Sequence, residues 1–238
     1  DGSEDCMVGW WQSMWIQAWN YTLKYPDKIG TWVLQHLYIV LVANAIAAVL
    51  GVLIGVYISG KGRERLAETV IYFASIMMTV PSLALYGILM GVLYAMSLPS
   101  IGFLPVVIAL TLYGLLPIIR NTYTAIREVD PAMIEAGRGM GMSELQILFR
   151  IKLPLAVPVI MAGLRQAMVM NIGIAAIGSY IGAGGLGQPI FRGLANLRRD
   201  LIVVGAVFVS LLAIAVDFFM GGVEWITTPK GVRIRRKR

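Results

Sequence analysis

Two patterns in the sequence contain residue types that are used in nucleotide chemistry. The run Gly182-Ala-Gly184-Gly185-Leu-Gly187 satisfies the G-x-G-x-x-G pattern of dinucleotide-binding loops. Such a loop joins a β-strand to a helix within a βαβ unit, whereas this run follows an apolar stretch of helix length. We therefore interpret Gly182, Gly184, Gly185 and Gly187 as a flexible turn.

The second pattern, from Gly55 to Lys61, has the glycine and lysine spacing of a P-loop. Gly62 stands where a Ser or Thr is required to bind Mg²⁺, so any ATP must bind to another chain. One histidine, His36, and one cysteine, Cys6, provide neither a Cys/His metal cluster nor an intrachain disulfide. No nucleophile with a base and no paired acid and base stand in the apolar stretches, so we expect no enzymatic activity and no metal.

The composition indicates which elements must position these residues. Hydrophobic residues make up 58% of the 238 residues and charged residues only 14%, whereas soluble domains are roughly half apolar and about one quarter charged. A helix that crosses a bilayer needs about 20 mostly apolar residues. Five stretches qualify: 33–59, 67–97, 104–126, 155–180 and 201–222. We predict an all-α integral membrane protein with about five transmembrane helices.

The second of these stretches is longer than one crossing requires and contains Pro81 near its middle. Proline removes a backbone hydrogen bond and clashes with the preceding turn of a helix. Each half on its own is short for a crossing. We therefore expect one kinked or discontinuous span rather than two spans.

The positions of the basic residues predict the orientation. With five spans and the N-terminus outside, fourteen of the 20 Lys and Arg residues fall in segments 60–66, 120–152 and 230–238 on one side, and five fall on the other. Lys and Arg favour cytoplasmic loops, so the first side is assigned to the cytoplasm. This topology accounts for the net charge of +7 without a nucleic-acid partner.

The two ends of the chain differ in character. Residues 8–21 place Trp and other apolar side chains at helical spacing, which predicts an interfacial helix within an extracytoplasmic aromatic segment, 1–30. The chain begins without Met, which leaves open whether residues 1–6 are native. Six Lys and Arg residues in 230–238 give a basic cytoplasmic tail, 226–238, for which we hypothesise contact with anionic lipid and a sensitivity to ionic strength.

The polar loop 128–154, between the third and fourth spans, is too patterned to be a plain connector. Asp130 and Pro131 are suited to the cap and first position of one helix. Ser143 and Gln146 form a capping box for a second helix that runs to Pro154. Two short helices separated by glycines make a projection suited to docking on a partner. A solvated connector is the alternative.

This loop resembles the EAA loop of ABC importer permeases, whose pattern is EAA, three residues, G, nine residues, I, one residue, LP. The residues in register are Glu135, Ala136, Gly141, Ile151, Leu153 and Pro154. Gly137 replaces the second Ala and is expected to loosen the first helix. Segments 79–84, 115–124, 182–187 and 228–231 are similar to permease subunits of bacterial osmoprotectant importers, which carry glycine betaine, carnitine or choline. The resemblance covers about residues 33–231.

The resemblance implies a permease of the type I ABC importer kind in the bacterial inner membrane, with its transmembrane domain at 31–225. It implies a second permease copy or paralogue, two ATPase subunits that hold ATP and Mg, and a periplasmic or lipid-anchored binding protein. This chain would bind no cofactor itself. The residues implied to couple to the ATPase are Glu135, Ala136, Gly137, Gly141, Met142, Ile151, Leu153 and Pro154. The alternatives are a permease for another solute, such as an amino acid like methionine, and an ATP-independent channel or structural membrane subunit.

Polar residues within spans are costly and often functional. The residues we assign to a translocation pathway are Asn44, Pro81, Tyr86, Tyr113, Asn171 and Asp217, and the glycine turn 182–187 is assigned to a gate. Tyr86 and Tyr113 are included because aromatic faces attract quaternary ammonium groups. Arg165 requires an acidic partner if it is buried. His36 is expected to be interfacial, and Gly51-x-x-x-Gly55 and Gly87-x-x-x-Gly91 are expected to pack within the chain.

Overall fold

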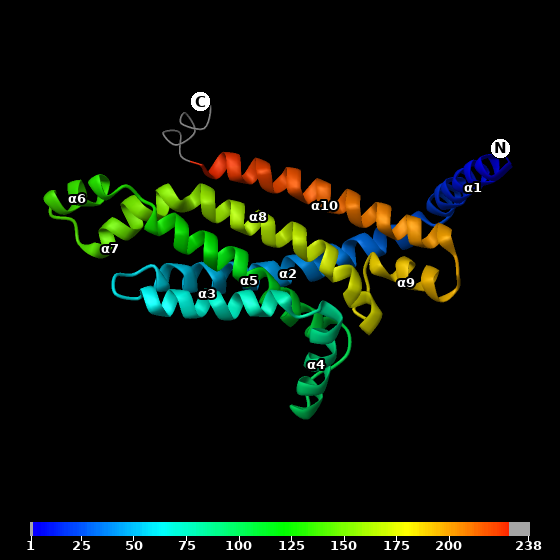
Figure 1. Ribbon diagram of the computed structural model, residues 1–238, viewed down its shortest axis with the longest axis horizontal. Helices are drawn as coiled ribbons and strands as arrows, with labels where there is room; N and C mark the ends of the chain where they lie inside the picture. Colours follow the sequence, from blue (N-terminus) through cyan, green and yellow to red (C-terminus); the bar gives the residue numbers. More distant parts are fainter. Residues whose placement is uncertain (1, 229–238) are drawn as a thin grey trace. The chain divides into compact units, whose positions relative to one another are not determined.

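The computed structural model describes the backbone of residues 2–228 and the side chains of residues 12–228. The first half forms five helices: α1 (Gly2–Lys24), α2 (Pro26–Ile58), α3 (Glu64–Thr79), α4 (Ser82–Ala95) and α5 (Phe103–Arg127) (Figure 1). The second half contains α6 (Pro131–Gly139), α7 (Glu144–Ile147), the π-helical turn η1 (Leu148–Lys152), α8 (Leu153–Gly178), the 3₁₀ turn η2 (Ser179–Ile181), α9 (Gly187–Ala195) and α10 (Arg199–Thr227). Within the described residues there is no strand, so the predicted all-α class is confirmed. The basic residues of 230–238 lie outside this range.

Four helical runs are long and apolar enough to cross a membrane: Pro26–Ile58, Phe103–Arg127, Glu144–Ile181 and Arg199–Thr227. The bent pair of α3 and α4 provides a fifth if it is one broken span. Four or five candidate spans agree with the predicted number of about five, although several helices extend beyond the predicted apolar limits. Arg120, which the charge pattern assigned to a loop, lies within α5.

The break between α3 and α4 lies at the predicted proline. Val80 (φ −68°, ψ 126°) and Pro81 (φ −58°, ψ 131°) have extended backbone conformations between the two helices. Proline donates no hydrogen bond, and its ring moves the preceding residue away from helical geometry. The predicted discontinuity at Pro81 is confirmed.

The long helices contribute to two compact units, each with its own buried residues. One unit contains residues up to Ala43, Pro81–Leu110 and Asn171–Ala215, and the other contains Asn44–Val80, Thr111–Met170 and residues from Val216 onward. In the first unit the buried cluster consists of Ala18, Ile29, Trp32, Leu186 and Val204. In the second, buried clusters include Ile58, Ala67 and Ile119, and Ala125, Ile126, Ala156 and Ile160.

The two Gly-x-x-x-Gly pairs have different surroundings. A Cβ on Gly51 would lie 2.7 Å from Ile118 Cγ2, and one on Gly55 would lie 2.6 Å from Thr122 Cβ. The predicted packing within the chain is therefore confirmed for this pair. A Cβ on Gly87 or Gly91 would meet nothing within 4 Å. The same prediction is wrong for that pair, because this face of α4 is exposed.

Candidate functional site

The two short helices of the loop begin at the predicted caps. Asp130 Oδ1 accepts a hydrogen bond from the backbone N–H of Ala132 at 2.9 Å, with Pro131 at the first helical position of α6. Ser143 and Gln146 form a capping box at α7: Ser143 Oγ accepts from Gln146 N at 3.3 Å, and Gln146 Oε1 accepts from Ser143 N at 2.8 Å. These local bonds satisfy helix N–H groups that would otherwise lack partners.

A glycine turn and an ion pair connect α6 to α7. Gly141 adopts φ +80°, a left-handed conformation that favours glycine, and its N–H donates to Arg138 O at 2.9 Å. The Arg138 guanidinium donates to Glu144 Oε1 from Nε at 3.0 Å and from Nη2 at 2.8 Å. Hydrogen bonding to Arg138 lowers the pKa of the exposed Glu144 carboxyl. Figure 1 shows both short helices beyond the adjoining ends of α5 and α8.

The second loop helix was predicted to run to Pro154, and in the structure the helical run reaches Pro154 and continues past it. The α7 helix continues through the π-helical turn Leu148–Lys152 into α8, where Pro154 occupies the first turn. The N–H of Leu153 donates to Leu148 O, five residues back. A π turn accommodates the missing donor and the ring of proline without ending the helix.

The residues at the predicted coupling positions differ in exposure. One is buried (Gly137), three are exposed (Glu135, Ala136 and Gly141), and four are partly buried (Met142, Ile151, Leu153 and Pro154). Gly137 is buried, and a Cβ there would lie 2.8 Å from Ile151 Cδ1 and 3.4 Å from Met142 Sδ. The departure from the second Ala of the EAA pattern therefore has a packing reason: the Ile151 methyl occupies the space that a side chain would fill. Glu135 and Ala136 remain exposed.

Large apolar side chains of the same segment are also exposed, which the sequence pattern did not reveal. They are Met133, Met140, Leu145 and Phe149. An exposed set of this kind beside charged residues is typical of a surface that binds another protein. The coupling role of this segment remains a prediction.

Four of the residues assigned to a pathway are buried against their own chain: Asn44, Tyr86, Tyr113 and Asn171. Three of them donate to backbone carbonyls. Tyr86 Oη donates to Ile174 O at 3.1 Å, and Asn171 Nδ2 donates to Leu110 O at 3.0 Å. Tyr113 Oη donates at 2.6 Å to the carbonyl of Val80, which begins the break before Pro81. These contacts stabilise the fold, and the pathway role of the residues remains a prediction.

Asp217, which with Pro81 makes up the two remaining pathway assignments, pairs with Arg165 between α8 and α10. Arg165 donates to the Asp217 carboxylate through Nε and Nη2, each at 2.5 Å. Glu224 lies 3.5 Å from Arg165 Nη1, and Gly221 leaves room for the guanidinium. An acidic partner was expected only if Arg165 is buried. Its side chain is 34% exposed, and two carboxylates nevertheless pair with it.

The glycine turn that was expected to be flexible is held by two side chains of α2. Gln35 Oε1 accepts from Gly185 N at 3.1 Å, and His36 Nδ1 accepts from Leu186 N at 3.2 Å. The other ring nitrogen, Nε2, lies 3.0 Å from Ile172 O. A carbonyl only accepts, so Nε2 carries the proton and the ring is the neutral Nε2–H tautomer.

Two predictions about this region are corrected. His36 is buried rather than interfacial, because its ring bridges the turn and α8. Gly182, Gly184 and Gly185 adopt positive φ values, but Gly187 begins α9, where a Cβ would lie 1.9 Å from Ala176 O. The turn is therefore fixed by close contacts rather than flexible, and the gating role assigned to it remains a prediction.

A groove of about 480 Å³ on α3 and α5 was missed by the sequence reasoning. It is lined by Glu68, Ile71, Tyr72, Ser75, Arg120, Tyr123 and Thr124. Aromatic rings and a carboxylate attract ammonium groups, and a guanidinium binds carboxylates. The spacings from Glu68 to Tyr72 and from Arg120 to Tyr123 place each pair on one helix face, which is the signal that was available in the sequence.

Comparison with known proteins decides the family. Residues 32–224 match the family described as binding-protein-dependent transport system inner membrane component. The chain belongs to this family. As an inner membrane component of a transport system, it is a multi-pass membrane protein rather than a soluble domain.

Individual relatives match this chain over most of its length. The chain is 40% identical over 214 residues to the osmoprotectant import permease protein OsmW of Salmonella typhimurium, covering 90% of this chain and 98% of that protein. It is 42% identical over 209 residues to the carnitine transport permease protein OpuCB of Listeria monocytogenes, covering 88% and 91%.

Solved structures of transporters share the fold. A chain of the MetNI methionine ABC transporter in an inward-facing conformation matches with a TM-score of 0.76 at 23% identity, covering 87% of this chain and 99% of that one. A chain of an amino acid ABC transporter crystallised with histidines matches with a TM-score of 0.71 at 18% identity, covering 86% and 96%. At these identities the likeness establishes the fold alone.

Proposed function

We propose that this chain is the permease subunit of an ATP-driven importer for quaternary ammonium osmoprotectants such as glycine betaine, carnitine or choline. The observation that carries the proposal is the 40% identity to an osmoprotectant import permease over 90% of this chain. The solute class follows these relatives rather than the amino acid transporters, whose similarity is lower and limited to the fold. A family defined by binding-protein-dependent transport argues against an ATP-independent channel.

The partners in this proposal are two ATPase subunits that bind ATP and Mg, a second permease copy or paralogue, and a periplasmic or lipid-anchored binding protein. The α6–α7 segment, on the cytoplasmic side, is proposed as the contact with the ATPase. It has an exposed carboxylate at Glu135 and exposed apolar side chains at Met140, Leu145 and Phe149. ATP binding would then bias the transmembrane helices through α8, which continues directly from this segment.

The coupling proposal is tested by substituting Glu135→Gln in the assembled importer and measuring uptake of labelled glycine betaine by cells. We expect uptake to fall by at least about tenfold, which corresponds to about 1.4 kcal/mol of lost coupling, while membrane insertion is unchanged. Glu128→Gln is the matched control, since Glu128 is an exposed carboxylate outside the two loop helices. Equal uptake in the two variants would contradict the coupling role of Glu135.

We further propose that the groove on α3 and α5 contacts the solute during transport. Tyr72 and Tyr123 would face the quaternary ammonium group, Glu68 would balance its charge, and Arg120 would bind the carboxylate of betaine or carnitine. Choline has no carboxylate, so Arg120 would contribute nothing to its transport.

This difference between solutes provides the test. Arg120→Gln is expected to weaken uptake of betaine and carnitine and to spare choline, whereas Tyr72→Leu is expected to weaken all three by about threefold to thirtyfold. Tyr94→Leu serves as the control, because Tyr94 is exposed on α4 outside the groove. The same loss for choline as for betaine in Arg120→Gln would exclude the proposed orientation of the solute.

A further inference from the structure

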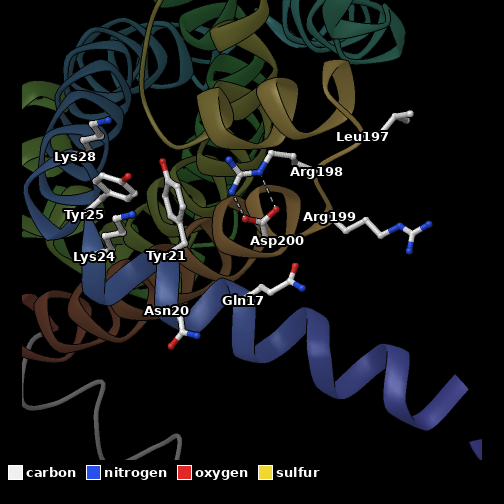
Figure 2. Close-up of a pocket in the computed structure, with 10 residues that line it drawn as sticks. All are labelled: Gln17, Asn20, Tyr21, Lys24, Tyr25, Lys28, Leu197, Arg198, Arg199 and Asp200. Carbon is white, nitrogen blue, oxygen red and sulfur yellow. Dashed lines mark hydrogen bonds and ion pairs between the residues drawn. The ribbon is translucent and has the colours of Figure 1, made fainter. Parts of the chain in front are cut away.

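A pocket of about 760 Å³ lies where α1 meets α2, beside the turn that precedes α10. All of its lining residues belong to the first compact unit. They are Gln17, Asn20, Tyr21, Lys24, Tyr25, Lys28, Leu197, Arg198, Arg199 and Asp200 (Figure 2). Neither the coupling segment nor the groove on α3 and α5 contributes to it.

The charges of this pocket favour an anion. Four cationic side chains line it: Lys24, Lys28, Arg198 and Arg199. The one acidic lining residue, Asp200, is already paired with Arg198, at 3.2 Å from Nε to Oδ1 and 2.5 Å from Nη2 to Oδ2. The lining therefore has an excess of positive charge, which attracts an anionic ligand.

Three of these cations, Lys24, Lys28 and Arg198, lie near the rings of the two tyrosines of the pocket. The rings of Tyr21 and Tyr25 have centroids 4.9 Å apart. Lys28 Nζ lies 4.6 Å from the Tyr25 centroid, and Arg198 Cζ lies 5.8 Å from the Tyr21 centroid. Because cations of the chain already occupy the ring faces, a quaternary ammonium group would meet both repulsion and occupied sites. Figure 2 shows Tyr21, Tyr25, Lys24 and Lys28 grouped on one side of the pocket.

Besides the polar face that lines the pocket, α1 exposes an apolar face. Trp15, Ile16, Trp19 and Leu23 recur at helical spacing, and each exposes more than half of its surface, between 51% and 64%. Ala18, on a third face, is buried against Trp32 and Val204. The α1 helix therefore has a buried face, an apolar exposed face and a polar face that lines the pocket. Amphipathic helices with Trp and Leu on one face and Lys on the other lie at the boundary between lipid headgroups and acyl chains.

We propose that this pocket binds the phosphate of an anionic phospholipid headgroup, with the acyl chains lying along Trp19 and Leu23. Lys24, Lys28 and Arg199 contribute positive charge, and the Tyr hydroxyls can donate hydrogen bonds to phosphate oxygens. The side chain of Leu197, which also lines the pocket and is 89% exposed, adds further apolar surface. This site is independent of the transported solute and of the ATPase.

The test measures lipid binding to the full chain in a neutral detergent by native mass spectrometry. Phosphatidylglycerol is the anionic probe and phosphatidylcholine the neutral one. The variant Lys24→Gln/Lys28→Gln removes two pocket charges, and Arg192→Gln is the control, an exposed arginine of α9 outside the pocket. Each lysine is expected to contribute about fivefold to the affinity for phosphatidylglycerol.

The proposal is supported if the double variant binds phosphatidylglycerol at least tenfold more weakly while Arg192→Gln binds normally. Far-UV circular dichroism checks that the variants keep their helix content. For the unaltered chain, salt is expected to weaken phosphatidylglycerol binding and leave phosphatidylcholine binding unchanged. The salt measurement uses the unaltered chain, so it does not depend on whether a variant folds.

Three results would overturn the proposal. Equal phosphatidylglycerol affinity in the double variant and the control would show that the pocket is not the lipid site. Binding of glycerol phosphate or inorganic phosphate alone with the same affinity would assign the pocket to a soluble phosphate. Lysine-dependent binding of a polyglutamate peptide without binding of phosphatidylglycerol would assign it to an acidic protein surface.

Discussion

Two glycine-containing segments of this chain are held by different kinds of contact. In the α6–α7 segment, the capping and ion-pair contacts join residues two to six positions apart. In the turn 182–187, the bonds from Gln35 and His36 cross 150 positions of sequence. The first segment remains exposed around Glu135, whereas Leu186 and Gly187 of the second are buried.

Glycine therefore occurs in two settings, a segment held by local bonds and a turn held by long-range bonds. A segment held by local bonds can move as a unit with a partner, since no distant contact has to break. A turn held by long-range hydrogen bonds and close backbone approach can move only if those bonds are lost. Loss of the buried bond to His36 leaves buried polar groups without partners. We therefore expect substitutions in the turn to affect stability and substitutions in the α6–α7 segment to affect transport.

The largest expected effect is that of Gly185→Ala. Gly185 adopts φ +85°, and a Cβ would lie 2.9 Å from His36 Nδ1. A left-handed conformation costs roughly 1–2 kcal/mol for a non-glycine residue, and overpacking adds about 1–3 kcal/mol. The free energy of unfolding should fall by about 4 kcal/mol, measured by reversible unfolding in mixed detergent micelles.

Gly182→Ala is the matched control for this substitution. Gly182 has nearly the same φ, +86°, but the nearest atom to its Cβ would be Ile101 Cγ2 at 3.6 Å. Only the backbone strain of about 1–2 kcal/mol is then expected. Equal losses in the two variants would mean that His36 does not confine the turn, and the contrast with the α6–α7 segment would fail.

The second effect is that of His36→Leu, which removes the hydrogen bonds to Leu186 N and Ile172 O. A buried polar group without a partner costs about 1–3 kcal/mol, so we expect a loss of about 3 kcal/mol in the same unfolding assay. Gln35→Leu should cost less, about 1 kcal/mol, because Gln35 is exposed and water can replace its bond to Gly185. A loss for Gln35→Leu as large as that for His36→Leu would contradict this ranking.

A smaller effect is expected for Gly137→Ala in the α6–α7 segment. The nearest atom to the new Cβ is the terminal Ile151 Cδ1 at 2.8 Å, which can move by a change of rotamer. Ala in a helix is favoured over Gly by about 1 kcal/mol, which offsets that movement. We expect a net change in unfolding free energy below about 1 kcal/mol.

Gly139→Ala is the control for Gly137→Ala, because a Cβ on Gly139 meets nothing within 4 Å and should stabilise α6. A loss above about 2 kcal/mol in Gly137→Ala alone would show that tertiary packing around Ile151, rather than local bonding, fixes this segment.

The smallest effect is expected for the Arg138–Glu144 pair, measured by a double-mutant cycle at low and high salt. Both partners are exposed, so the coupling should be weak and screened by salt. The pKa of Glu144 is lowered in the folded chain, so the contribution is present above the unfolded pKa and is lost as the pH falls through the folded pKa. A coupling insensitive to both salt and acid would indicate that the pair is held by more than local attraction.

The sequence by itself determined the features that depend on local composition and short spacing. The apolar stretches predicted the membrane class and the set of spans, and Pro81 predicted the break between α3 and α4. The caps of α6 and α7 followed from Asp130 and Ser143, because a cap involves residues only two or three positions apart. The six residues of the EAA pattern indicated the family for the same reason, since they lie within one short segment.

Only the tertiary structure decided which polar and glycine residues meet across the chain. The burial of His36, the carboxylates around Arg165 and the open surroundings of Gly87 depend on helices far apart in sequence. The groove that brings Tyr72 and Arg120 together depends on the packing of α3 against α5. Spacing along one helix shows which residues share a face, but the neighbour of that face is set by the packing of the whole chain.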